Sequence, residues 1–111
     1  MKIINLTPHA ITLFCGGDEQ FVFPADAAGP ARVEMQREPA GLVNGIPVSR
    51  VLVGEVYGLP EPAEDTVFIV SRVVAEACPL RHDLFITDGA VRDKEGRVVG
   101  CTGFARCDTP T

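Results

Sequence analysis

The sequence contains no tryptophan and a single tyrosine, Tyr57, and only two of its ten cationic residues are lysines. With aromatic residues so scarce, the core has to be built largely from Val, Ile, Leu and Phe, a mixture typical of β-sheets. The formal net charge is −5, whereas proteins that bind duplex nucleic acid usually present a strongly basic face. The composition therefore argues against a duplex nucleic acid partner. Its arginines still suit a small anion, because the planar guanidinium matches phosphate and carboxylate groups.

Long apolar runs are missing as well. No segment approaches the roughly 20 apolar residues that are needed to span a bilayer. The first residues lack the apolar stretch and small-residue cleavage site of a secretory signal. We therefore expect a cytoplasmic protein that has no membrane partner. The four cysteines are then expected to be reduced thiols, because disulfides are rare in that compartment.

The familiar motifs of catalysis and metal binding are also absent. The sequence has no Gly-x-Ser-x-Gly elbow, no glycine-rich phosphate loop and no His-Glu-x-x-His helix. The pairs His9–Cys15 and Cys101–Cys107 are each six residues apart, which does not match the close ligand pairs of zinc sites. We therefore expect no metal, no cofactor and no catalytic residues.

What is present is a chain of 111 residues with nine prolines and eleven glycines. This length fits one domain. Pro and Gly at this density suit many short strands with frequent turns and would break a helical bundle. We therefore predict a single domain, residues 1–111, of mainly β (α+β) class: a small antiparallel sheet or barrel with one short helix at about residues 71–78.

Two segments in the first half predict a hairpin. Residues 31–38 alternate between apolar and polar side chains, with Val33 and Met35 among those expected to face inward, and this period is typical of a half-buried strand. Asn44-Gly45 is a strong signal for a tight hairpin turn. The strand signal then resumes over residues 46–57.

The clearest element lies in the second half. The apolar run Val67–Val70 is expected to be a central strand that is covered on both faces. Ser71 is a natural N-cap for a helix that Pro79 would end. Two helical turns are marginal in isolation, so this helix has to be held by packing on the sheet.

Three places carry candidate binding residues. Ser71 and Arg72 open the helix, where free amide groups favour anions, although the simpler interpretation, in which Ser71 only caps the helix and Arg72 is solvated, is favoured. Arg81 follows the helix in a loop, the kind of segment in which functional side chains gather. Asn5, Thr7 and His9 surround a proline turn. They either form the rim of a polar pocket or simply satisfy the amides of the turn.

The chain resembles a family of small uncharacterised phage, prophage and bacterial proteins. The likeness rests on Asn5-Leu6-Thr7-Pro8-His9, on Tyr57-Gly58-Leu59-Pro60 with Val67–Ser71, and on the segment from Val91 to Cys101. It spans most of the chain and supplies no catalytic residues. A phage setting implies a role like that of anti-defence sponges, which sequester nucleotide-derived immune signals without cleaving them and commonly form oligomers with ligand pockets between subunits. The compartment would then be the cytoplasm of a bacterial host.

From these observations we expect a non-enzymatic protein that sequesters a small anionic, nucleotide-like ligand and works as a homo-oligomer. Ser71 and Arg72 would hold phosphate with help from Arg81 or Arg92, and Tyr57 or Phe104 would stack on a base. One alternative is a small enzyme that acts on a nucleotide-like substrate with His9 or His82 as acid or base. Another is a protein–protein interaction or inhibitor module.

Overall fold

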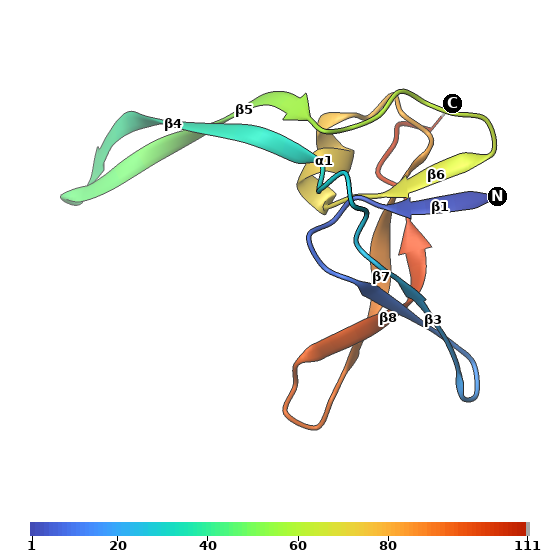
Figure 1. Ribbon diagram of the computed structural model, residues 1–111. Coiled ribbons are helices and arrows are strands. Elements are labelled where there is room, and N and C mark those ends of the chain that lie inside the picture. The colour runs from blue at the N-terminus through green and yellow to red at the C-terminus, as the bar shows by residue number, and fades with distance from the viewer. Residues whose placement is uncertain (111) are drawn as a thin grey trace.

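The computed structural model describes residues 1–110 and confirms the mainly β class with one short helix (Figure 1). Its elements, in chain order, are β1 (Lys2–Asn5), β2 (Ile11–Cys15), β3 (Glu19–Phe23), β4 (Arg32–Val43), β5 (Ile46–Tyr57), β6 (Thr66–Ile69), α1 (Arg72–Ala77), β7 (Leu84–Arg92) and β8 (Val98–Ala105). Six strands form a curled sheet, and β4 and β5 form a separate hairpin.

The curled sheet is mixed in strand direction. Its order is β1-β6-β7-β8-β2-β3, with parallel pairing of β1 with β6, β6 with β7 and β2 with β8. The pairs β7–β8 and β2–β3 are antiparallel. The parallel β6–β7 pair follows from the chain path, because a helix between two neighbouring strands carries the chain back to the same end of the sheet. The sequence predicts an antiparallel sheet or barrel, whereas the sheet is mixed. The difference arises because the alternation of side chains along one strand does not encode the direction of its neighbour.

The core lies where β6, α1 and β7 meet. All four residues of Val67–Val70 are buried, which confirms the expected covered strand. Ser71 is the N-cap of α1, since its side chain accepts a hydrogen bond from the amide of Val74. Val74 is buried in the same apolar cluster as Phe68 and Leu84. Packing on the sheet therefore holds this six-residue helix, as expected.

The hairpin of β4 and β5, here called the arm, projects from the body of the molecule (Figure 1). Its turn is Asn44-Gly45, with φ angles of 52° and 79°, which fits the two-residue hairpin turn that the sequence predicts. At its root, Val33 and Val56 pack against the core. The prediction that Met35 faces inward is wrong, because Met35 lies just beyond the root and its side chain is exposed.

Candidate functional site

A polar recess lies between the turn after β1, the start of α1 and β7. It has a volume of about 330 Å³ and is lined by Thr7, His9, Ile11, Val70, Ser71, Arg72, Ile86 and Thr87. Four of these residues, Thr7, His9, Ser71 and Arg72, were singled out from the sequence in two separate segments. The fold brings them together because β1 pairs with β6, so that both strands end at the same edge of the sheet.

The turn from residue 6 to residue 9 is shaped by Asn5. This side chain is buried, and its amide nitrogen donates hydrogen bonds to the carbonyl oxygens of His9 (2.8 Å) and Phe23 (2.9 Å). Its oxygen accepts from the backbone amide of Thr7 at 2.9 Å and lies 2.7 Å from the hydroxyl of Thr7. Asn5 therefore positions the turn that carries Thr7 and His9, and its own polar atoms are occupied by the protein.

Arg72 provides an exposed guanidinium group at the polar recess. Its guanidinium group lies 3.3 Å from the carboxylate of Glu76, and both side chains are exposed. An exposed ion pair of this kind contributes at most about 1 kcal/mol, so Arg72 is free to exchange its partner for a bound anion. The helix itself has six residues. Any ligand would thus depend on the side chains around the recess more than on the helix dipole.

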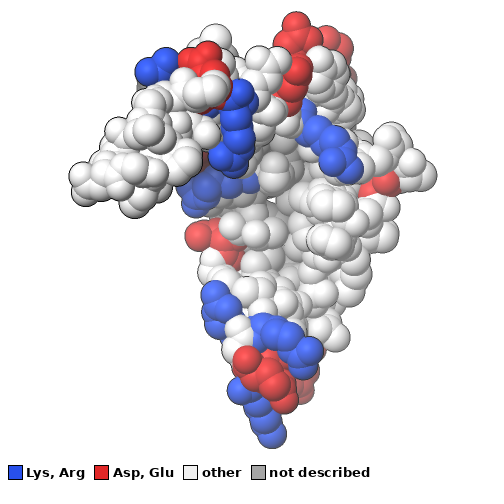
Figure 2. All heavy atoms as spheres, turned by 90° about the vertical axis from the view of Figure 1, so that its left-hand side faces the viewer, with Lys and Arg blue, Asp and Glu red and all other residues white. Residues whose placement is uncertain are grey.

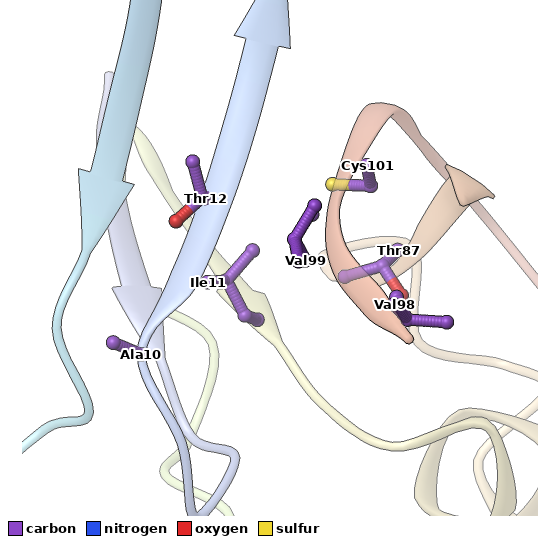
Figure 3. Close-up of a pocket in the computed structure, with 8 residues that line it drawn as sticks. Ala10, Ile11, Thr12, Thr87, Val98, Val99 and Cys101 are labelled. Carbon is purple, nitrogen blue, oxygen red and sulfur yellow. The ribbon is translucent and has the colours of Figure 1, made fainter. Parts of the chain in front are cut away.

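An apolar recess adjoins the polar one (Figure 3). It has a volume of about 220 Å³ and opens between β2 and β8, with Ala10, Ile11, Thr12, Thr87, Val98, Val99, Gly100 and Cys101 around it. The two strands share one register position, Leu13 with Cys101, and the recess forms beside that contact. Ile11 and Thr87 line both recesses, which therefore lie side by side and are here together called the groove. The other side chains are mostly polar in the first recess and mostly small or aliphatic in the second.

The thiol of Cys101 faces the apolar recess (Figure 3). Cys101 is buried, and this burial raises the pKa of its thiol above the ordinary value. A raised pKa keeps the group protonated near neutral pH, and a protonated thiol is a poor nucleophile. Cys101 therefore acts as a small apolar wall of the groove.

Two arginines that the sequence suggested as phosphate ligands have structural partners elsewhere. Arg81 forms an ion pair with Asp83 and also donates a hydrogen bond to the carbonyl oxygen of Pro60. Arg92 donates to the carbonyl oxygen of Gly96 at 2.8 Å and so braces the turn between β7 and β8. In the described part of the chain, neither arginine lines the groove.

The two aromatic residues suggested for base stacking also lie apart from the groove. Tyr57 is the last residue of β5, at the root of the arm, and its hydroxyl donates a hydrogen bond to Glu34 at 3.2 Å. Phe104 stacks on Phe85 with ring centroids 6.0 Å apart and meets the edge of Phe23 at the same separation. Among the described residues, the groove offers a flat ligand the aliphatic side chains of its apolar end and the imidazole ring of His9.

The histidines sit in different surroundings. His9 lines the polar recess. His82 lies 2.5 Å from a carboxylate oxygen of Asp108, and Arg106 also binds Asp108, which holds the pKa of that carboxyl group far below its usual range. Within residues 1–110, no cluster of three or more His, Cys, Asp or Glu side chains is arranged to hold a metal ion. The same residues contain no helix long and apolar enough to cross a membrane.

Sequence reasoning missed the apolar end of the groove. Ile11 and Thr87 carry no motif, and Val98 and Val99 were noted for the family resemblance alone. The four meet because β8 lies between β7 and β2 in the sheet, and β2 pairs with β8 across more than 80 residues of chain. Comparisons of the chain with protein-family models, with curated proteins and with solved structures find no match.

Proposed function

We propose that the protein is a non-enzymatic binder of a small anionic, nucleotide-like ligand, which it holds in the groove. The observation that carries this proposal is the meeting of Thr7, His9, Ser71 and Arg72 in a polar recess that continues into an apolar one. Small-molecule sites are typically concave and mostly apolar, with a few convergent polar groups. The two recesses have that character.

The division of the groove suits the two halves of a nucleotide. Arg72 would bind phosphate, since a guanidinium donates two parallel hydrogen bonds to such an anion. The hydroxyl of Ser71, which accepts a hydrogen bond from the amide of Val74, would add its own hydrogen as a further donor at the same end. A base or sugar would lie between Ile11 and Val99 in the apolar recess, where contact is by van der Waals packing.

Binding without chemistry is supported by the groups in the groove. The thiol in its apolar end is Cys101, whose raised pKa disfavours the nucleophilic thiolate. Together with the resemblance to phage and prophage proteins, this leads us to propose a sponge. Such a protein would act in the cytoplasm of a bacterial host as a homo-oligomer and sequester an immune signalling nucleotide.

The test is calorimetric titration of the protein with cyclic dinucleotides, cyclic mononucleotides and linear nucleotides. At least one should give saturable heat, and Arg72→Ala should weaken it roughly tenfold or more, because a hydrogen bond to a charged group contributes about 1.5–3 kcal/mol. Arg97→Ala is the matched control. Arg97 is also exposed and also sits 3.3 Å from a carboxylate four residues away, Asp93, but in the turn between β7 and β8. If no nucleotide gives heat, the proposal fails.

The fate of the bound ligand distinguishes an enzyme that acts on a nucleotide-like substrate from a protein that only binds it. The bound nucleotide is released by denaturing the protein after a long incubation and identified by mass spectrometry. A binder returns it intact in stoichiometric amount. Recovery of a converted nucleotide would instead favour catalysis with His9, the histidine that lines the groove.

A second candidate function is a protein–protein interaction module. The arm favours it, because apolar side chains along β4 and β5 are exposed. A stable complex with one host protein, lost on changing the arm and retained by Arg72→Ala, would support this function in place of ligand binding.

A further inference from the structure

A third recess, here called the root recess, lies at the root of the arm. It has a volume of about 370 Å³, and its apolar lining includes Leu6, Pro8, Ala31, Val33, Met35 and Val73. These side chains come from the turn after β1, from the residues around the start of β4 and from the first turn of α1. Because Val33 packs against the core, the wall that the arm contributes is fixed to the body. The root recess thus resembles the largely preformed, mostly apolar sites in which small molecules bind.

The root recess adjoins the polar recess of the groove, because Thr7 and Ser71 line both. The polar recess shares a different pair of residues, Ile11 and Thr87, with the apolar recess. Within residues 1–110, the linings of the root recess and the apolar recess have no residue in common. The polar recess therefore lies between two recesses in which apolar side chains predominate.

The charged side chains at these recesses are arginines. Arg72 lines the polar recess and Arg32 lines the root recess, and both are exposed. Arg72 has the exchangeable partner Glu76, and the ion pairs among residues 1–110 do not include Arg32. In that part of the chain, no Asp or Glu lines any of the three recesses. Figure 2, in which the side that bears the arm faces the viewer, shows basic side chains around the foot of the arm. In a chain with a net charge of −5, this is a place that favours an anion.

The sizes of the recesses favour a ligand that is longer than a mononucleotide. The root recess is the largest of the three, with about 370 Å³ against 330 Å³ for the polar and 220 Å³ for the apolar recess. A mononucleotide in the groove leaves the root recess open to water. Since removal of apolar surface from water is favourable, a ligand that also fills the root recess binds more tightly than one that ends in the polar recess.

We infer that the root recess is the subsite of a second nucleoside and that the ligand of this protein is a dinucleotide. The inference rests on the proposed function, because it extends the same site. One nucleoside lies in the apolar recess, and the second lies in the root recess. The phosphate that joins them lies in the polar recess between, beside Arg72. Arg32 binds the further phosphate that a cyclic or 5′-phosphorylated dinucleotide carries.

Two half-exposed side chains give the second base its contacts. Met35 is 49% exposed and Val73 is 44% exposed, and both line the root recess. The sulfur of a methionine packs favourably against an aromatic ring, and a nucleotide base presents such a ring. A base that lies against Met35 and Val73 removes both side chains from water. The exposure of these apolar side chains then serves the ligand.

The test is calorimetric titration of the wild-type protein with matched ligands. For each of the common bases, the ligands are the 5′-mononucleotide, the 5′-phosphorylated linear dinucleotide and the cyclic dinucleotide. We expect at least one dinucleotide to bind roughly tenfold tighter than its mononucleotide, or more. The reason is that a second base leaves water and a second arginine gains a hydrogen bond to phosphate.

Two variants of the root recess, Arg32→Gln and Val73→Asn, should each lower this preference for a dinucleotide by about threefold or more. Arg37→Gln is the control for the first, because Arg37 is also an exposed arginine of β4 but lines none of the three recesses. Val51→Asn is the control for the second, because Val51 is 45% exposed on the arm and outside the recesses. Both controls should keep the preference of the wild type. Circular dichroism checks that the variants fold, and if one of the first two does not, the other decides.

The methionines of the sequence, Met1 and Met35, allow a direct measurement of the contact. In protein with carbon-13 in the methionine methyl groups, the nuclear magnetic resonance signal of Met35 should shift on saturation with the dinucleotide, because a base ring then lies against this side chain. Met1 is the internal control, since it precedes β1 and lines none of the three recesses. The mononucleotide should shift the Met35 signal much less.

A wild-type protein that binds a mononucleotide as tightly as every dinucleotide overturns this inference and leaves the proposed function standing. The same holds for a preference that Arg32→Gln and Val73→Asn both retain, and for a Met35 signal that a saturating dinucleotide leaves in place. Absence of heat from every nucleotide is the different result that overturns the proposed function, and the second subsite with it.

Discussion

Arg81 and Asp83 form a two-point ion pair in which both hydrogen bonds, Nε to Oδ1 and Nη2 to Oδ2, are 2.8 Å long. Their side chains are 21% and 16% exposed. Arg81 also reaches the carbonyl oxygen of Pro60. The pair thereby ties the segment after α1 to the proline-rich loop that precedes β6, and Arg81 serves the fold where the sequence had suggested a phosphate ligand.

This ion pair should make stability depend on pH in the acid range. The hydrogen bond from Arg81 lowers the pKa of Asp83 below its ordinary value. A carboxyl group with a lowered pKa in the folded state stabilises the protein above its unfolded pKa of about 4, and this contribution is lost as the pH falls through the folded pKa. Asp83→Asn should therefore cost about 1–3 kcal/mol at pH 7 and little at acid pH. Urea unfolding of both proteins between neutral and acid pH measures the difference, and a constant difference would contradict it.

Asn5→Ala should be among the more destabilising single changes at a polar residue. The buried amide makes hydrogen bonds to His9, Phe23 and Thr7, and each is worth about 1 kcal/mol, so the loss should reach about 2–3 kcal/mol. Chemical denaturation measures it. Thr7→Ser keeps the hydroxyl beside Asn5 and should change stability by less than about 0.5 kcal/mol, the usual range for a mild surface substitution. An equal loss in both variants would show that Asn5 does not organise the turn.

Local features of the fold were predictable from the sequence. The run Val67–Val70, the cap Ser71 and the turn Asn44-Gly45 each act through neighbours a few residues away. A covered strand, a helix start and a tight turn leave their pattern in such short stretches. The residues of the polar half of the candidate groove could be predicted for the same reason. They lie in two short polar segments, Thr7 and His9 in one and Ser71 and Arg72 in the other.

Long-range features were not predictable. The apolar half of the groove depends on the pairing of Leu13 with Cys101, which no local pattern encodes. Met35 alternates like a residue that faces the core, but the pattern shows only that one face of the strand is apolar. Whether the body of the same chain or a second copy covers that face is a property of the fold. The sequence suggested that Arg81 could bind phosphate, because a local pattern does not show that Asp83, two residues away in the same loop of mixed charge, is its ion-pair partner.

Gly100 allows β8 to approach β2 beside the apolar recess. A Cβ atom there would lie 2.3 Å from the ring of Phe14 and 2.6 Å from the carbonyl oxygen of Thr12, and neither the backbone nor a packed ring can move away cheaply. Gly100→Ala should therefore cost about 1–3 kcal/mol, as overpacking typically does. Gly103 lies in the same strand, and a Cβ atom there meets nothing within 4 Å. Thermal unfolding should show a clear loss for Gly100→Ala and almost none for Gly103→Ala, and similar losses would contradict the close approach of the two strands.

Tyr57 offers a direct optical measurement of the root of the arm, because it is the one tyrosine of the sequence. Its hydrogen bond to Glu34, and then the negative charge of that carboxylate, raise the pKa of the phenol above 10.0. Ultraviolet titration of the phenolate should thus show ionisation above the ordinary pH. Added salt should lower the pKa toward the ordinary value, because exposed charges are screened.

Substitution of Glu34 should lower the pKa of Tyr57 as well. Glu34→Gln removes the charge and weakens the hydrogen bond, so the titration of Tyr57 should move to lower pH. Glu38→Gln is the control, since Glu38 lies on the same face of the arm but pairs with Arg50, and it should leave the titration unchanged. If Glu34→Gln leaves the pKa where it was, or if both variants shift it equally, the contact between Tyr57 and Glu34 does not persist in solution. The root of the arm would then be less well ordered in solution than in the structure.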